Sequence, residues 1–409
     1  MTTCRDALSL VLSSVAPLPA RPTALFDALG LVLAERVVSP ETVPPFTNSA
    51  MDGYAVRAAD CVAAEPGSPV SLDVLADLPA GSVATHEVTA GTAIRIMTGA
   101  PLPGGADSVV PVEATASEGS RVRIAAPVRN GANVRLAGED LREGEELLPA
   151  GFALTPAALG ILASVGLAEV SVRPRVRVAI LTTGDELVDA SAKPGPGQIR
   201  DSNVQTMCGQ AASFGAVPVP IPRVPDTRED VTAALTRARV EADVIVTNGG
   251  ISVGDYDFIK AVLGASGARE VFWKVRQKPG GPLGFWLWGA TPVFGIPGNT
   301  VAAMVCMEEY VRPALRKMMG HAKLFRPEVA ATFEGAFRKS APDGKVHLIR
   351  VRARREGGRV VVSPSGPQGS GILSSMLRSN ALALVPADAL ALRTGDEVAV
   401  HLIEEPEDR

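Results

Sequence analysis

The chain has 409 residues, of which 46% are hydrophobic and 21% charged. This balance is typical of a folded protein rather than a disordered one, and the length predicts about two to four domains. The formal net charge is −4 at pH 7, so no global basic field would attract nucleic acid or an anionic membrane. We therefore expect no nucleic-acid partner and no membrane partner. Any bound anion must be held by local basic groups and backbone N–H groups.

Cysteine usage and the N-terminus bear on the cellular location. The four cysteines lie far apart without a CxxC pair, and histidine is scarce, so neither a disulfide framework nor a zinc site is expected. Leu8, Leu12 and Val15 recur at helical spacing, which favours a short surface helix over a signal peptide. No stretch approaches the roughly 20 apolar residues that a membrane-spanning helix needs. The predicted location is cytoplasmic.

The first part of the chain changes character twice. Residues 1–46 are expected to hold a helix, a proline-rich loop and a second helix near residues 23–34. Short alternating runs between glycine and proline clusters then predict a small all-β unit. A further helix should begin at Thr155-Pro156, because threonine caps a helix and proline fits its first turn. We expect an extended α+β domain (1–46 plus 135–172) with an inserted β lid domain (47–134).

After residue 173 strands and helices alternate. The predicted order is a strand at 176–181, a helix at 203–214, a strand at 217–221, a helix at 227–241, a strand at 243–246 and a helix from about Tyr256. This alternation implies a mostly parallel sheet covered on both faces, within a three-layer α/β domain at 173–322. A last helix is expected at 299–319. Residues 323–409 read as a small β-barrel-like domain, so the fold class is α/β and β multidomain.

Two loops that follow strands of this sheet carry polar groups. Residues 182–187, TTGDEL, offer hydroxyls, a glycine and two carboxylates, although a helix cap alone could explain them. Residues 248–257, NGGISVGDYD, combine three glycines, a serine and two aspartates, and exposed N–H groups at such a helix start can bind an anion. Ligands bind outside the carboxyl ends of parallel strands, so the two loops predict one active site.

Basic residues and a second tight turn add to this site. Lys274, Arg276 and Lys278 alternate along a predicted strand at 273–280, which places them on one face, though a solvated face is the simpler alternative. Residues 295–299, GIPGN, form another turn of backbone donors. Carboxylates and lysines around glycine loops indicate a divalent cation with a polyanion, and Mg²⁺ often shares its oxygen ligands with phosphates. The absence of GxxxxGK[ST] argues against a P-loop NTPase.

These loops, together with NSAMDGYA at 48–55 and MTGAP at 97–101, resemble the molybdopterin molybdenumtransferase family, which includes bacterial MoeA and the gephyrin E domain. NVR at 133–135, GED at 138–140 and QGS at 368–370 also match, in family order. The resemblance implies an elongated cytoplasmic homodimer that inserts molybdate into adenylyl-molybdopterin and releases AMP in a Mg²⁺-dependent step. It also implies an active site shared between the molybdopterin-binding α/β domain of one subunit and the β lid of the other.

The resemblance assigns roles to residues from several domains. Catalytic positions are Asp52, Thr98, Asp140, Glu186, Asp226, Asp257, Lys274 and Lys278. The expected Mg²⁺ ligands among them are Glu186, Asp226 and Asp257, since Asp257 rather than Asp255 occupies the family's carboxylate position. Substrate binding is expected from Arg135, Thr183, Gly184, Gly249, Gly250, Ser252, Gly254, Pro297, Gly298, Asn299, Arg350 and Ser370.

The chain also departs from the family pattern. Gly281 stands where the family usually has lysine, and Thr300 where it usually has proline. These changes leave open a divergent paralogue that handles tungstate, and a non-catalytic molybdopterin-binding scaffold is the other alternative. The related single-domain molybdopterin adenylyltransferase shares a TGDE-like loop but lacks the β domains and NSAMDGYA. The adenylyltransferase is instead an expected partner of this protein, together with the apoenzymes that accept the cofactor.

Overall fold

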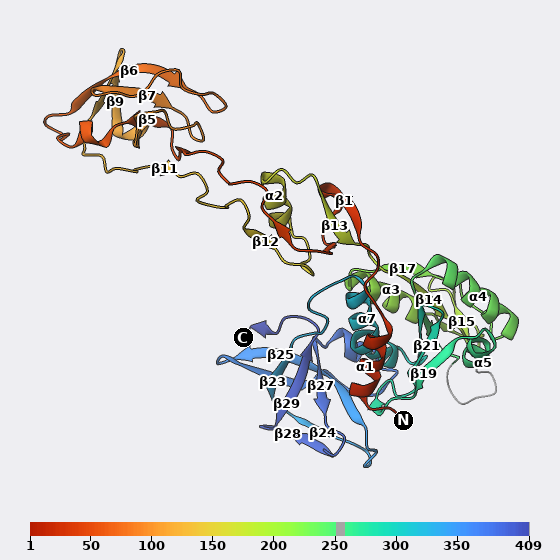
Figure 1. Ribbon diagram of the computed structural model, residues 1–409. Coiled ribbons are helices and arrows are strands. Elements are labelled where there is room, and N and C mark those ends of the chain that lie inside the picture. Colours follow the sequence, from red (N-terminus) through yellow and green to blue (C-terminus); the bar gives the residue numbers. More distant parts are fainter. Residues whose placement is uncertain (251–257, 409) are drawn as a thin grey trace.

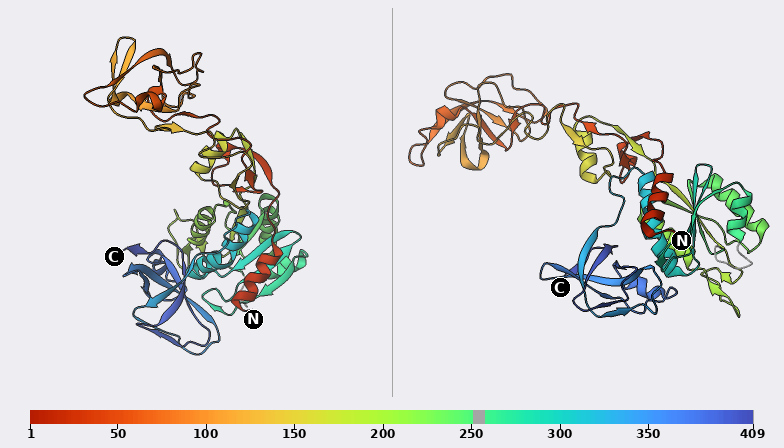
Figure 2. Two further views of the ribbon diagram at one scale, coloured as in Figure 1. Left: turned by 60° about the vertical axis from the view of Figure 1, so that its left-hand side comes forward. Right: turned by 60° about the horizontal axis from the view of Figure 1, so that its bottom comes forward.

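The computed structural model describes residues 1–250 and 258–408. The chain is elongated (Figure 1), with a β lid at one end, a small α+β unit in the middle, and the α/β domain beside the C-terminal β domain at the other end. Two further views agree on this order (Figure 2). In the described part of the chain, no helix is long and apolar enough to cross a membrane.

The α/β domain is built on a six-stranded sheet of order β17-β14-β18-β22-β21-β19. The first four strands pair in parallel, β21 runs antiparallel to both of its neighbours, and β19 again runs in the direction of the first four. Their bounds are β14 (Arg177–Thr182), β17 (Val217–Pro220), β18 (Val244–Asn248), β19 (Arg269–Trp273), β21 (Gly284–Trp288) and β22 (Thr291–Ile296). The predicted three-layer domain with a mostly parallel sheet is confirmed.

Helices cover both faces of this sheet. Val178 and Ile180 of β14 pack into one core, whereas Ala179 and Leu181 pack into the other. Because both faces are buried, residues 178–181 of this strand form a continuous apolar run rather than an alternating pattern. The helices of the first face are α1 (Cys4–Ser14), α3 (Asn203–Ser213), α6 (Thr300–Cys306), η4 (Met307–Val311) and α7 (Arg312–Met318); those of the second are α4 (Arg228–Glu241) and α5 (Phe258–Ala265).

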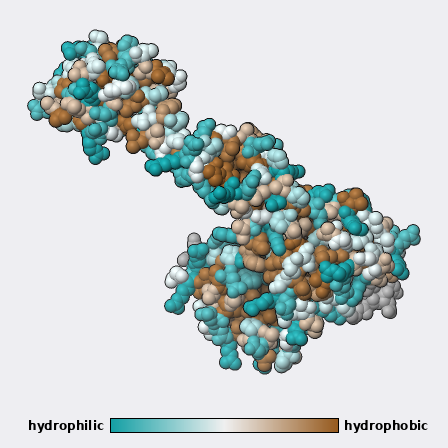
Figure 3. Space-filling view, viewed as in Figure 1, coloured by the Kyte–Doolittle hydropathy of each residue, from teal (hydrophilic) through white to brown (hydrophobic). Residues whose placement is uncertain are grey.

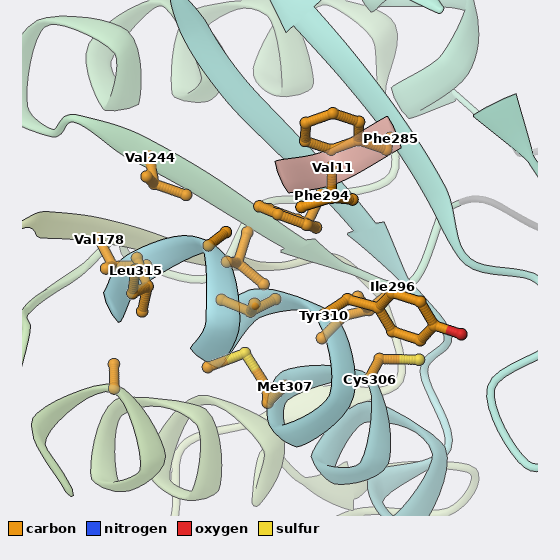
Figure 4. Close-up of a cluster of buried hydrophobic side chains, with 14 of the residues drawn as sticks. Val11, Val178, Val244, Phe285, Phe294, Ile296, Cys306, Met307, Tyr310 and Leu315 are labelled. Carbon is orange, nitrogen blue, oxygen red and sulfur yellow. The ribbon is translucent and has the colours of Figure 1, made fainter. Parts of the chain in front are cut away.

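The core of the first face brings the N-terminal helix α1 together with the last helix of the α/β domain. Figure 4 shows Val11 of α1 beside Phe285 and Phe294 of the sheet, Tyr310 of η4 near Ile296, and Leu315 of α7 near Val178, all within one core. The predicted N-terminal amphipathic helix therefore forms, and its apolar face packs on the α/β domain. The last helix contains the π-helical segment η4, and Pro313 at the start of α7 has no N–H group to donate to a carbonyl of the preceding turn.

The middle unit contains strands where a helix was predicted. The helix expected near residues 23–34 is wrong, because this segment forms β1 (Arg21–Ala24), the short 3-10 helix η1 (Leu25–Asp27) and β2 (Val32–Leu33). Both strands pair with β13 (Glu169–Arg173), and Gly30 turns the chain between them at φ 74°. Tertiary pairing with a distant strand thus overrides local helix propensity. The helix predicted at Thr155-Pro156 is confirmed as α2 (Pro156–Ser164), capped by the Thr155 hydroxyl.

The lid is a six-stranded sheet of order β8-β5-β7-β6-β10-β9. At Gly53 a Cβ atom would lie 2.0 Å from the Val110 carbonyl oxygen, so glycine is required where β5 meets β8. The lid strands are β5 (Gly53–Val56), β6 (Val70–Leu78), β7 (Thr92–Ile96), β8 (Ser108–Pro111), β9 (Thr115–Glu118) and β10 (Arg121–Ile124), with η2 (Ala58–Cys61) and η3 (Val112–Ala114). Short pairs in the connecting arm and the α/β domain are β3 (Val37–Val38) with β12 (Glu146–Leu148), β4 (Asn48–Ser49) with β11 (Val134–Arg135), and β15 (Leu187–Val188) with β16 (Ile199–Arg200).

The C-terminal domain is a barrel, as predicted. Strand β25 pairs with both β26 and β27, which closes the five-stranded ring β25-β26-β23-β29-β27. The strands are β23 (Glu328–Phe333), β25 (Val346–Glu356), β26 (Arg359–Pro364), β27 (Ala381–Val385) and β29 (Glu397–Leu402), accompanied by β24 (Ala336–Arg338), α8 (Leu373–Leu377), β28 (Ala391–Arg393) and β30 (Glu407–Asp408). Strand β20 (Gln277–Lys278) of the preceding domain also pairs with β25.

A histidine ties the barrel to the α/β domain. His401 of β29 lies between Glu309 of η4 and Glu328 of β23, with N–O distances of 3.0 and 3.1 Å. Burial alone would lower the pKa of His401, but the hydrogen bonds and charges of the two glutamates outweigh it and raise the pKa. The positive charge of this imidazole therefore contributes to stability at pH values below its raised pKa.

We predict a pH-dependent effect of His401→Gln on thermal stability. Because the folded-state pKa is raised, the stabilisation should be fully present below the ordinary histidine pKa of about 6.5 and lost as pH rises through the raised value. The Tm difference between wild type and variant, measured by calorimetry, should be largest in the acidic range and shrink at alkaline pH. The exposed His86→Gln serves as control, and a Tm difference independent of pH would contradict this role of His401.

Candidate active site

The three central parallel strands end at one edge of the α/β sheet. Thr182 of β14 pairs with Asn248 of β18, which in turn pairs with Ile296 of β22. Beyond these residues, the Thr183 amide donates to the Asn248 carbonyl (3.1 Å) and the Gly249 amide donates to the Ile296 carbonyl (3.2 Å). The loops after the three strands therefore lie side by side, as expected for the carboxyl ends of parallel strands.

A pocket of about 430 Å³ lies between these loops. Seven of the residues predicted from the sequence line it: Thr183, Glu186, Gly249, Gly250, Pro297, Gly298 and Asn299. Predicted residues Ser252, Gly254 and Asp257, as well as Asp255, lie outside the described residues. The pocket has the size of a small-molecule site and combines hydroxyl, carboxylate and backbone groups.

The glycines of the second loop are explained by close packing. Gly249 and Gly250 have φ values of 86° and 62°, which L side chains rarely adopt. A Cβ atom would lie 2.9 Å from the Thr183 carbonyl oxygen at Gly249, and 2.8 Å from Ile259 at Gly250. The glycines thus allow the backbone of the second loop to reach the first.

Two polar residues at the start of α3 also belong to the pocket, and sequence reasoning missed them. Buried Asp201 accepts from the Thr182 hydroxyl (2.5 Å) and from the backbone N–H of Asn203 (3.0 Å). The Asn203 amide donates to Asn248 Oδ1 (2.7 Å) and to the Gly298 carbonyl (2.5 Å). Asn203 therefore connects the loops after β18 and β22. The run Asp201-Ser202-Asn203 before a predicted helix was a capping signal that could have found them.

Carboxylates gather beside the first loop. The Asp226 backbone N–H donates to Asp185 Oδ1 (3.3 Å). Burial, followed by the negative charges of Asp185 and Glu186, raises the pKa of Asp226. The Glu186 carboxylate folds back over Gly184, where a Cβ atom would lie 2.5 Å from Glu186 Oε2. Such mutual repulsion is typical of a site that uses a cation.

The described carboxylates do not by themselves complete a metal site. Among residues 1–250 and 258–408, no group of three or more histidine, cysteine, aspartate or glutamate side chains is arranged to hold a metal ion. Asp257, the third predicted ligand beside Glu186 and Asp226, lies outside the described residues. The predicted magnesium ligands therefore stay a prediction.

The basic run at 273–280 is not the single strand that the sequence predicted. Strand β19 ends at Trp273, and Lys274 has a positive φ of 71°, with its ammonium 4.2 Å from the centre of the Trp273 ring. The alternation nevertheless persists beyond this kink, since Val275 and Gln277 are buried whereas Arg276 and Lys278 are exposed. The kink is therefore local, and Arg276 and Lys278 still share one exposed face.

Arg350 brings a buried positive charge from the barrel. Its side chain donates to Ser375 Oγ (3.0 Å) and to the carbonyls of Pro367 (3.2 Å) and Gly369 (3.0 Å). Burial lowers the pKa of Arg350 to about 10, and no described carboxylate forms an ion pair with it. The loop it holds reaches the start of α6, where the Val301 amide donates to the Ser370 carbonyl (3.2 Å). Ser370 is thus close to the Pro297–Asn299 turn.

The predicted lid residues form two groups far from this pocket. Asp52 Oδ1 accepts from the backbone N–H and the hydroxyl of Thr98, both at 2.7 Å, and these hydrogen bonds lower the pKa of Asp52. Arg135 and Asp140 line a separate, open hollow in the arm together with Asn48. Both groups lie toward the far end of the chain from the α/β sheet (Figures 1 and 2). One copy of the chain does not bring them to the pocket.

Comparisons with known proteins cover nearly the whole chain. Residues 2–166 match the MoeA N-terminal region (domain I and II), residues 179–317 a probable molybdopterin binding domain, and residues 336–403 the MoeA C-terminal region (domain IV). Molybdopterin molybdenumtransferase 2 of Mycobacterium tuberculosis is 39% identical over 92% of this chain and 93% of its own length. The molybdopterin molybdenumtransferase of a Nostoc species is 34% identical over 98% of this chain and 93% of its own length.

Solved structures agree with these relatives. A crystal structure of the molybdopterin biosynthesis moeA protein from Pyrococcus horikoshii OT3 superposes with a TM-score of 0.79 at 31% identity, covering 98% of this chain and 100% of that one. The three matched regions occur in the same order as the lid-bearing half, the α/β domain and the barrel described above. The chain belongs to the molybdopterin molybdenumtransferase (MoeA) family.

Proposed function

We propose that this protein is a molybdenumtransferase that inserts molybdate into adenylyl-molybdopterin and releases AMP in a Mg²⁺-dependent step. The observation that carries the proposal is the pocket at the strand ends, where backbone N–H groups, hydroxyls and carboxylates converge within reach of the Arg350-held loop. Membership of the family and the names of its relatives support the reaction class. A cytoplasmic location, and contacts with an adenylyltransferase and cofactor-accepting apoenzymes, are part of the same proposal.

The carboxylates at the pocket edge suit magnesium in kind. Glu186 and Asp226, with Asp257, would hold the ion against the pyrophosphate of the substrate, because Mg²⁺ takes carboxylate and phosphate oxygens together. Burial and the charges of Asp185 and Glu186 already raise the pKa of Asp226, and a divalent cation would offset that repulsion. When bound, Mg²⁺ would polarise the phosphoryl oxygens and stabilise the charge that develops as AMP leaves.

The cationic and backbone groups would bind the anionic parts of the substrates. Lys274 and Lys278 would neutralise phosphate or molybdate oxygens. Arg350 would contribute to substrate binding by holding in place the loop that carries Ser370. The backbone of Gly249, Gly250 and the Pro297–Asn299 turn would hold the pterin and its phosphate. In this proposal the negative oxygen atoms of the substrates would be held between these groups and the metal-binding carboxylates.

We further propose that the active site is completed by a second copy of the chain. Asp52, Thr98, Arg135 and Asp140 lie on the lid and arm, away from the pocket of their own chain, which supports a site shared between two subunits (Figure 1). Apolar residues are also visible on the surface of the middle unit (Figure 3), where Phe26 is 100% exposed and Leu29 49%. Exposed apolar surface of this kind is typical of an interface.

Asp226→Asn should remove most of the insertion activity. Losing one charged group that stabilises the transition state reduces kcat on the order of 10²–10³-fold. The assay supplies adenylyl-molybdopterin, molybdate and a Mg²⁺ titration, and follows both AMP release and cofactor formation. Glu229→Gln, exposed in the first turn of α4, is the matched control. Unchanged turnover of the Asp226 variant, or a wild type that binds substrate without turnover, would favour a scaffold instead.

Two inactive variants should complement each other if the site is shared. Asp52→Ala and Asp226→Asn, mixed after denaturation and refolding, form mixed dimers in which one site carries both changes and the other neither. Random pairing then predicts about a quarter of wild-type activity in the mixture. Each variant refolded alone is the control. A mixture no more active than its components would show that a single chain completes its own site.

A further inference from the structure

A second hollow lies at the opposite edge of the α/β sheet, where the middle unit joins the α/β domain. It has a volume of about 170 Å³ and is lined by Arg173, Arg175, Arg316 and His321, among others. Strand β14 begins at Arg177, just after this joint, and ends at the active-site pocket. At about 3.3 Å per residue, its six residues separate the two edges by roughly 20 Å. We call this hollow the joint pocket.

The joint pocket carries positive charge without a matching carboxylate. No aspartate or glutamate lines it, and within the described residues none of its three arginines forms an ion pair. Burial and the neighbouring Arg326 lower the pKa of Arg316. Burial and the charges of Arg316 and Arg312 lower the pKa of His321 to about 4. Each of these shifts is of the kind that a bound anion would reverse.

Capping of carbonyl groups is the simpler explanation of these arginines. Arg175 Nη1 donates to the Gly215 carbonyl beyond α3 (3.0 Å), and Arg316 Nε donates to the Lys323 carbonyl beyond α7 (2.7 Å). Arg173 Nη1 donates to the Leu18 carbonyl (2.5 Å). A helix end offers only about half a negative charge, however, whereas a guanidinium carries a full charge and five N–H donors. Capping therefore uses part of the donors and leaves charge uncompensated.

We propose that the joint pocket binds one tetrahedral inorganic oxyanion, of the class of phosphate, sulfate or molybdate. Guanidinium groups bind oxyanions through paired N–H donors, and three of them surround this hollow. Its 170 Å³ is below the roughly 300 Å³ at which pockets for larger organic ligands begin, so the hollow suits a small ion rather than a nucleotide. This site is separate from the active-site pocket and does not depend on the proposed reaction.

The bound ion would connect the middle unit, which carries the lid, to the α/β domain. Arg173 ends β13 and Arg175 lies on the connection to β14, whereas Arg316 lies in the last turn of α7 and His321 follows that helix. Arg175 Nη2 also donates to the Leu29 carbonyl of the middle unit (3.4 Å). An anion shared by these side chains would join the β13–β14 connection, the end of α7 and the turn at Leu29, at the place where the middle unit meets the α/β domain (Figures 1 and 2).

The whole 409-residue chain allows a local test, because it contains four histidines whose NMR signals can be assigned by substitution. We would titrate phosphate, sulfate and molybdate in turn, at constant ionic strength set by chloride, and follow the imidazole signals of His321. A bound anion should shift these signals saturably and raise the pKa of His321, while those of the exposed His86 stay constant. A response to molybdate alone assigns the site to the substrate ion; a response to all three assigns it to a general oxyanion.

Variants separate the joint pocket from anion binding elsewhere. Arg175→Gln, at an exposed side chain, should weaken the His321 response by about tenfold or more, the scale for losing one hydrogen bond from a charged group. The double variant Arg175→Gln with Arg316→Gln should abolish it, and Arg359→Gln, at an exposed position in the barrel, is the matched control. No saturable shift with any of the three anions, or a shift that survives in the double variant, would overturn the proposal.

Discussion

The alignment of three parallel strands is the constraint on which the rest of the structure depends. Because β14, β18 and β22 pair in register up to Thr182, Asn248 and Ile296, the loops that follow must leave the sheet at one edge. Parallel sheets occur almost only where helices cover both faces. In this domain, helices and strands bury an apolar core on each face of the sheet. Burial of the strands thus concentrates the polar groups at their ends, where the pocket lies.

Buried polar groups then hold those loops in place. Asp201 and Asn203 at the start of α3 connect the ends of all three strands through side-chain hydrogen bonds. Arg350 plays a comparable part in the barrel, since its guanidinium fixes the loop that touches the start of α6. Such groups are costly to bury unless their hydrogen bonds are made, so they specify one arrangement of the loops rather than several.

The predicted active-site residues are distributed over separate domains of the elongated chain. The lid carries Asp52 and Thr98 as an exposed, hydrogen-bonded pair, and the arm carries Arg135 and Asp140, all away from the α/β pocket of the same chain. The middle unit joins the α/β domain beside Arg173 and Arg175. The side chains at this joint therefore influence the direction in which the lid extends. A site divided in this way depends on geometry over the whole molecule rather than on one loop.

The sequence by itself determined the class of the α/β domain, the barrel and the loops that supply seven of the residues lining the pocket. The buried strand β14 contains a continuous apolar run at residues 178–181, Thr155 and Thr227 cap the helices they precede, and the glycine-rich loops follow strands directly. These signals are local, which is why they can be recognised in the sequence before the fold is known.

The tertiary structure decided those features that depend on residues distant in the sequence. Residues 23–34 became strands because β13 pairs with them, and Lys274 left the strand geometry at a kink. Asp201 and Asn203 joined the pocket because β18 and β22 end beside α3, and separations of this kind are fixed by packing rather than by neighbours in sequence.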